Sequence, residues 1–177
     1  WALNDKILIA TDGSEIGNRA LDCAAELSAR LGYDLCIMHV LLHDRPSDEL
    51  TRLVGSEHLA KHFHRAKTDK QSGPISAFAD VFPDAADETA RARAMVVLGD
   101  LIVDRASRRA QDAGAQNVTT RVCVGDCADE ILDMAECEKP KMIVLGRRGL
   151  GRVRETLLGS VSQKVLHHAP CTVVIAQ

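Results

Sequence analysis

The feature that most constrains the fold is an apolar strand, a helix and a second apolar strand within the first 42 residues. Residues 6–12 (KILIATD) are an apolar run that leads into Asp-Gly-Ser, where Gly13 permits a tight turn. Apolar residues then recur at helical spacing from Ser14, an expected N-cap, to Gly32, an expected C-cap. Residues 34–42 (DLCIMHVLL) are almost continuously apolar, which is typical of a strand buried on both faces. The spacing predicts a parallel βαβ unit.

The same alternation resumes in the second half of the chain. The pattern predicts a helix over 84–115, a strand over 117–125, a helix over 127–139, a strand over 141–146, a helix over 160–169 and a strand over 171–177. Five strands interleaved with helices predict one α/β domain over 1–177, with a doubly wound, mainly parallel Rossmann-like sheet and helices on both faces. In such sheets ligands bind beyond the carboxyl ends of the strands, where the strand order reverses.

Residues 43–83 form the least regular section. Apolar residues between Leu50 and Phe63 fit one short amphipathic helix, followed by a loop. His58 and His62 stand one helical turn apart, which is a spacing that can hold a metal ion. No acid nearby is fixed as a third ligand, so exposed helix histidines are the favoured interpretation.

Charge and hydropathy restrict the partners. The net charge of −3 and pI near 6.2 give no general attraction for nucleic acid or for an anionic membrane, so phosphate recognition has to be local. No apolar run reaches the roughly 18 residues of a membrane span, and the first residues lack the features of a signal peptide. A cytoplasmic protein is therefore expected, although a chain that begins with Trp leaves a preceding targeting segment open.

Six cysteines are spread among apolar neighbours without a CxxC pair. This pattern favours reduced, mostly buried thiols over disulfides. A metal or redox role for Cys123 and Cys127 is the less favoured alternative, because a strand end and a turn separate them.

Residues 144–160 (VLGRRGLGRVRETLLGS) combine four glycines and four arginines. The stretch is no Walker loop, since it lacks Gly-Lys, and no Rossmann fingerprint, since it does not follow the first strand. Glycines nevertheless allow a ligand to approach the backbone, and Gly159 and Ser160 open a helix whose N-terminus attracts anions. Ser160 also fits an ordinary N-cap. Local chemistry leaves a phosphate site and a surface turn equally open.

The spacing of Gly146, Gly149, Gly159 and Ser160 resembles the G-x2-G-x9-G-[ST] motif of the universal stress protein family, in its ATP-binding branch. Four further segments resemble the family in the expected order: residues 6–32, CIMHV at 36–40, VCVGDCADEIL at 122–132 and HHAPCTVVIA at 167–176. Cys127 departs from the family, which commonly has Pro there. The resemblance covers nearly the whole chain outside 43–83 and implies a fold like that of the adenine nucleotide alpha hydrolases.

The resemblance implies a site for ATP, ADP or AMP with Mg²⁺. Asp12 would lie near the ribose or the metal ion, the backbone of Val40 would meet the adenine, and the motif glycines with Ser160 would hold the phosphates. The full set implied as nucleotide-binding is Ala10, Asp12, Val40, Gly146, Arg147, Gly149, Gly159, Ser160 and Val161. Ordinary roles remain open: Asp12 could only cap its turn, and Arg147 and Arg148 could face water, which is favoured for Arg148.

No catalytic residue is predicted, because no second acid is assigned to the site by a motif. The expected function is a nucleotide-binding stress-response regulator with slow or absent ATP hydrolysis; a scaffold without nucleotide and a weak ATPase are the alternatives. An ATP pyrophosphatase relative is disfavoured, since ATDGS lacks the Ser-Gly-Gly-x-Asp-Ser loop of those enzymes. As in the family, the apolar strand 171–176 would pair with a second subunit in a homodimer. Residues 43–83 would then be a lid, an extra dimer contact or a mobile excursion.

Overall fold

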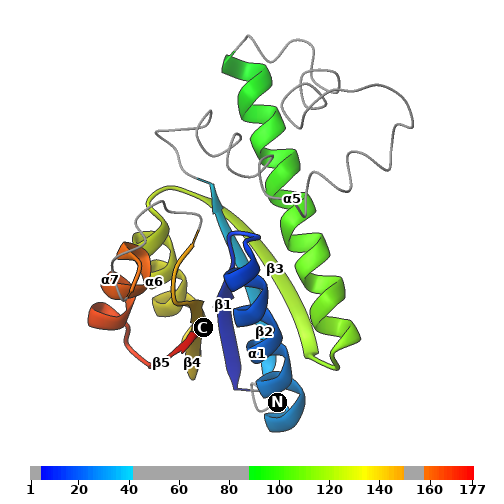
Figure 1. The fold of residues 1–177 in the computed structure, drawn as a ribbon, viewed down its shortest axis with the longest axis vertical. Helices are drawn as coiled ribbons and strands as arrows, with labels where there is room; N and C mark the ends of the chain where they lie inside the picture. Colours follow the sequence, from blue (N-terminus) through cyan, green and yellow to red (C-terminus); the bar gives the residue numbers. More distant parts are fainter. Residues whose placement is uncertain (1–4, 42–87, 150–157) are drawn as a thin grey trace.

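The computed structural model describes residues 5–41, 88–149 and 158–177. Figure 1 shows the described elements, which follow one another as β1 (Lys6–Ala10), α1 (Glu15–Leu31), β2 (Asp34–Leu41), α5 (Glu88–Asp112), β3 (Gln116–Val124), α6 (Cys127–Glu138), β4 (Met142–Gly146), α7 (Ser160–His168) and β5 (Thr172–Ala176). The insertion predicted at 43–83, with His58 and His62, lies outside the described residues. Among the described helices, none is both long enough and apolar enough to span a membrane.

The strands form one five-stranded sheet in the order β3-β2-β1-β4-β5, and every neighbouring pair is parallel. The chain runs outward from β1 to β2 and β3 and then returns to place β4 on the other side of β1. The strand order therefore reverses between β1 and β4, and their carboxyl ends form the switch point where ligands bind in such sheets. The predicted doubly wound α/β sheet is confirmed.

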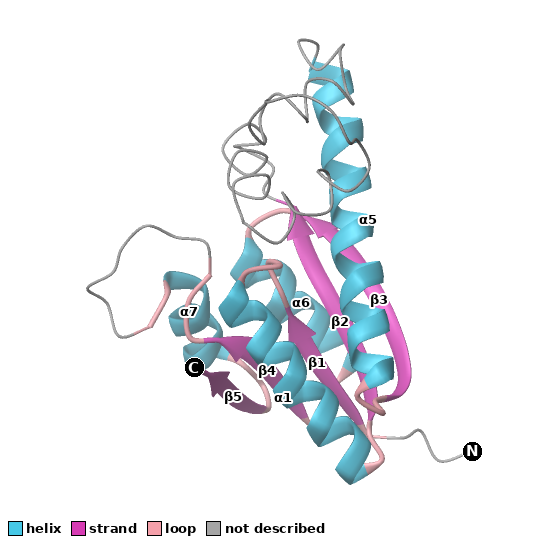
Figure 2. Ribbon diagram, turned by 45° about the vertical axis from the view of Figure 1, so that its right-hand side comes forward, coloured by secondary structure: helices cyan, strands magenta, loops and turns pink. Residues whose placement is uncertain are grey.

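Helices cover both faces of the sheet (Figures 1 and 2). On one face, Ile7, Ile9 and Ile37 pack with apolar residues of α1 and α5. On the other face, Leu8 and Met38 pack with residues of α6 and α7. Successive strand residues point to opposite faces, so both layers need an apolar side chain at almost every strand position. This requirement explains the continuous apolar runs in the sequence.

Local capping groups set several helix ends. The Ser14 hydroxyl accepts a hydrogen bond from the Gly17 amide at the start of α1, and Gly32 ends that helix with a φ of 70°. Both caps were predicted. The prediction that Ser160 could be an N-cap is wrong: Gly159 has the extended conformation of the N-cap residue, and Ser160 is the first residue of α7.

Candidate functional site

The turn after β1 is fixed by buried hydrogen bonds around Thr11, whose side chain is buried. The Thr11 amide donates to the Met38 carbonyl at 3.0 Å. Its carbonyl lies 2.8 Å from Nδ1 of His39, which is only 2% exposed. Because a carbonyl oxygen only accepts, Nδ1 carries the proton in this contact. The end of β1 is thus held firmly to β2.

Asp12 lies at the switch point, where glycines surround its carboxylate. Oδ1 of Asp12 accepts a hydrogen bond from the Ser14 amide at 3.0 Å, so the expected capping of the turn is present. A Cβ atom at Gly17 would lie 2.7 Å from Oδ1, and a Cβ atom at Gly149 would clash with Oδ2. Glycine at both positions lets the first turn of α1 and the segment after β4 approach one carboxylate, and Oδ2 faces Gly149.

The segment after β4 connects the sheet to α7. The Arg147 amide donates to the Ala176 carbonyl at 2.7 Å, and the Arg147 carbonyl accepts from the Gly159 amide at 2.9 Å. The Ser162 hydroxyl donates to the Gly146 carbonyl at 2.8 Å. These bonds place the first turn of α7 beside the carboxyl ends of β4 and β5.

The N-terminus of α7 carries no side-chain cap. Gly159 supplies none, and Ser160 is exposed. The first amides of a helix lack partners within the helix and carry the positive end of its dipole, so they attract an anion. Lys164 ties α7 to α6 through Asp129 at 2.6 Å and Asp126 at 3.5 Å. Hydrogen bonding from the Asp129 amide lowers the pKa of Asp126, the residue that caps α6.

Three other predicted residues lie on the α6 and α7 face. Val40 is buried near the carboxyl end of β2, while Ala10 and Val161 are partly buried in the same apolar cluster. The nine predicted residues therefore occur at the ends of β1, β2 and β4 and at the start of α7, as the strand order requires.

The side chains of the two arginines after β4 are half-buried. Nε of Arg147 is buried without a hydrogen-bond partner among the described residues, which distinguishes it from a fully solvated arginine. Arg148 is less exposed than the favoured water-facing interpretation implied, and it has an interaction partner. A buried donor of this kind costs free energy unless a ligand or water satisfies it.

Sequence reasoning missed four residues that shape the site: Thr11, Gly17, His39 and Ser162. None belongs to the glycine motif. Gly17 and Ser162 act through contacts that only the folded chain creates, with Asp12 and with the Gly146 carbonyl. A histidine within an otherwise apolar strand was the one available signal, because a buried ring nitrogen needs a partner.

Metal-ligating side chains are sparse in the described part of the chain, which contains no group of three or more His, Cys, Asp or Glu residues able to hold an ion. The cysteines are free, but only Cys36 is fully buried, so burial is less complete than predicted. Burial raises the pKa of Cys123, which favours its thiol form over a metal-binding thiolate.

Comparison with known proteins identifies the family. A sequence model of the Universal stress protein family matches residues 4–177. The chain belongs to the universal stress protein family. Universal stress protein YxiE of Bacillus subtilis is 29% identical over 174 residues, which are 98% of this chain and 99% of that protein.

Solved structures show the same fold. A universal stress protein in complex with cAMP superposes with a TM-score of 0.59 at 22% identity, covering 99% of this chain and 98% of the other. The universal stress protein of Archaeoglobus fulgidus in complex with dAMP superposes with a TM-score of 0.60 at 18% identity, covering 99% of both chains. At these identities the similarity establishes the fold alone.

Proposed function

We propose that this universal stress protein binds an adenine nucleotide at the switch point between β1 and β4 and acts as a nucleotide-dependent regulator. The observation that carries the proposal is the approach of Gly149 to the Asp12 carboxylate beside the uncapped start of α7. Two solved structures of the same fold are complexes with cAMP and dAMP, which supports an adenine nucleotide as the ligand class.

The phosphates would lie at the N-terminus of α7. Gly159 provides no side-chain cap for the first helical amides, and Ser160 beside them is exposed. The buried Nε of Arg147 would add a charged donor close to the same segment. At Gly146, the packing of Ile16 requires glycine, because a Cβ atom there would lie 2.9 Å from Cγ2 of Ile16. The α7 amides, the Ser160 hydroxyl and Arg147 each favour a ligand with negative charge.

The nucleoside would extend toward β1 and β2. Asp12 would accept a hydrogen bond from the ribose, and the backbone of Val40 would meet the adenine, with Ala10 and Val161 supplying apolar contacts. Val40 is buried, and Ala10 and Val161 are partly buried in the same cluster. An adenine base binds well against an apolar wall of this kind with few polar groups.

The residues present fit a Mg²⁺ ion carried by the nucleotide. The Asp12 carboxylate accepts from the Ser14 amide through Oδ1, and its Oδ2 lies beside Gly149. The described residues offer no cluster of three ligating side chains, so the ion would take its other ligands from phosphate oxygens and water, as Mg²⁺ commonly does. When bound, the ion would neutralise phosphate charge.

Regulation is favoured over catalysis, with hydrolysis slow or absent. Phosphoryl transfer to water needs a residue that orients the water in addition to the groups that neutralise charge. Among the described residues, Asp12 is the carboxylate beside Gly149, and its proposed role is already to hold the ribose or the metal ion. A scaffold without nucleotide is the second candidate.

A homodimer through β5 is part of the proposal. β5 lies at one edge of the sheet, and its residues from Val173 to Ala176 are only partly buried in one chain. An unpaired apolar edge strand promotes association, so pairing with β5 of a second subunit would cover it. Light scattering at micromolar concentration is expected to show a dimer, and a monomer alone would exclude this assembly.

The binding proposal is tested by purifying the full chain natively, identifying any released nucleotide by mass, and measuring melting with ATP, ADP, AMP and cAMP. Saturating ligand is expected to raise Tm by about 5 °C. The Gly159→Asp variant should lose this gain because its carboxylate repels phosphate. Gly159 has φ −70° and ψ 156°, a conformation that Asp adopts readily as an N-cap, so the variant should fold.

Gly159→Asn is the matched control, since it has nearly the same shape without the charge. It is expected to retain part of the nucleotide effect. If the wild-type protein releases no nucleotide and no ligand raises its Tm, the binding proposal fails and the scaffold is favoured. If Gly159→Asp keeps the full gain, a nucleotide binds elsewhere.

A further inference from the structure

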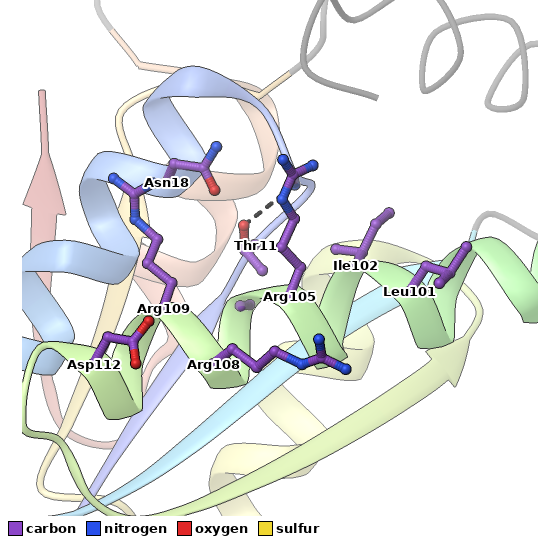
Figure 3. Close-up of a pocket in the computed structure, with 10 residues that line it drawn as sticks. Thr11, Asn18, Leu101, Ile102, Arg105, Arg108, Arg109 and Asp112 are labelled. Atoms are coloured by element: carbon purple, nitrogen blue, oxygen red, sulfur yellow. Dashed lines mark hydrogen bonds between the residues drawn. The ribbon is translucent and has the colours of Figure 1, made fainter. Parts of the chain in front are cut away.

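A cavity of about 340 Å³ lies on the opposite side of the turn after β1, between α1 and α5 (Figure 3). Among the described residues, its lining includes Thr11 and Gly13 from the turn but not Asp12, Gly146, Gly149 or Gly159. The volume is at the small end of the range for ligand pockets. One wall is apolar, built from Leu101, Ile102 and Ala106 of α5. The cavity therefore has room for a small molecule with an apolar body.

Three arginines of α5, Arg105, Arg108 and Arg109, line this cavity. Arg109 forms a bidentate ion pair with Asp22 of α1 at 2.5 and 2.7 Å, and Arg108 pairs with Asp104 at 2.8 Å. Arg105 differs, since it forms no ion pair with any carboxylate within the described ranges. Within the described part of the chain, its charge is therefore the least neutralised of the three.

The figure also shows where the arginines point. Arg105 extends toward Thr11, Arg109 reaches toward α1, and Arg108 turns away from Thr11 (Figure 3). Arg105, the Thr11 hydroxyl and the Asn18 amide thus come from three different elements and line one cavity. A guanidinium with neighbouring neutral donors matches a carboxylate or a phosphate monoester, because the planar fork can bind two oxygens.

The polar wall is preorganised. Thr11 is 5% exposed, and its backbone is fixed by the Met38 carbonyl and the His39 ring. Its hydroxyl oxygen accepts from the Gly13 amide at 3.2 Å and can still donate its own hydrogen. A ligand would not have to order this part of the wall, which reduces the entropy cost of binding.

We infer that this cavity is a second ligand site, which binds a small organic anion with one carboxylate or phosphate group facing Arg105 and an apolar body against Leu101 and Ile102. The inference does not depend on the proposed nucleotide site. The ion pair between Arg109 and Asp22 holds α1 to α5 at this cavity, and the Asp112 carboxylate lines the cavity near Arg109 (Figure 3).

The test is an amide NMR titration of the full chain with phenyl phosphate and, separately, with benzoate. Saturable shifts are expected at Gly13, Asn18 and Ile102, with a Kd on the order of 1 mM. Arg105→Gln should weaken binding by about tenfold or more, since it removes the charged donor. Arg30→Gln makes the same charge change in the last turn of α1, where Arg30 pairs with Glu26 and does not line the cavity, and should leave the affinity within about twofold.

The two probes separate the ligand classes: binding of either one through Arg105 supports the inference, and the tighter one identifies the anionic group. Three results would overturn it. These are the absence of saturable shifts with either probe, equal weakening by the two arginine substitutions, and shifts confined to Gly149, Gly159 and Ser160. The last result would assign the anion to the nucleotide site and leave the α5 cavity empty.

Discussion

The two sides of the turn between β1 and α1 offer anions different chemistry. On the side of β4, Gly149 and the start of α7 present mainly backbone groups near the Asp12 carboxylate. On the side of α5, arginine side chains line a cavity with an apolar wall. Backbone amides are fixed by the fold, whereas arginines lose side-chain freedom when they bind. We therefore expect the first side to be the more selective and the tighter of the two.

The largest expected effect is a loss of nucleotide affinity that leaves anion binding in the α5 cavity unchanged. Gly149→Val would push a branched side chain into Oδ2 of Asp12, because a Cβ atom alone already clashes there. The variant should lose about ten- to hundredfold in nucleotide affinity, equivalent to about 1–3 kcal/mol of overpacking. Phenyl phosphate binding in the α5 cavity should be unchanged. Calorimetry with AMP and the NMR titration measure the two affinities, and equal losses would show that the sites are not independent.

A smaller loss of affinity is expected at both sites in a single variant. Gly17→Ala adds a Cβ atom 2.7 Å from Oδ1 of Asp12 and 2.9 Å from the Thr11 hydroxyl oxygen. One side chain must shift, so both affinities are expected to fall, each by about tenfold. Ala is otherwise favourable in a helix interior, so the fold should be retained. If only the nucleotide affinity falls, Thr11 does not contribute to the α5 cavity.

Removal of the ion pair between α1 and α5 should weaken anion binding in the α5 cavity without changing nucleotide affinity. Arg109→Gln removes the ion pair with Asp22, in which both side chains are about half-exposed. The expected loss of unfolding free energy is about 0.5–1 kcal/mol, measured by urea denaturation. Organic anion binding should weaken while nucleotide affinity stays within error. A double-mutant cycle with Asp22→Asn isolates the pair, and additive losses would contradict the coupling.

The smallest expected effect is on how the stability of the fold depends on pH. Hydrogen bonding from Lys6 lowers the pKa of Glu138, which joins the start of β1 to the end of α6. A lowered folded-state pKa stabilises the fold above the ordinary glutamate pKa, and that contribution is lost as pH falls through the folded-state value. Glu138→Gln should cost about 0.5 kcal/mol at pH 7 and flatten the acid limb of stability against pH. An unchanged acid limb would mean that the pair contributes little.

Sequence reasoning captured most of the fold because the decisive signals are local. Caps at Ser14 and Gly32 and the apolar runs of the strands depend on neighbours in the chain, and they placed the described elements closely. The error at Ser160 came from a single residue: a serine and a glycine both suit an N-cap, and only the backbone conformation at Gly159 decides between them.

The sequence predicted only part of the candidate site. The glycine spacing drew attention to Gly146 at the end of β4 and to Gly159 and Ser160 at the start of α7. It gave no sign of Gly17 or His39, whose contacts arise when α1 and β2 pack around the turn. The α5 cavity was missed altogether. Its arginines look like the polar face of any amphipathic helix, and Arg109 meets Asp22 only through the packing of two distant helices.

The most direct test of the central claim is a crystal structure of the full chain grown with AMP and Mg²⁺. The account predicts phosphate oxygens within hydrogen-bond distance of the first α7 amides, with the ribose beside Asp12 and the base near Val40. AMP bound between α1 and α5, or at any place other than the switch point of β1 and β4, would contradict it.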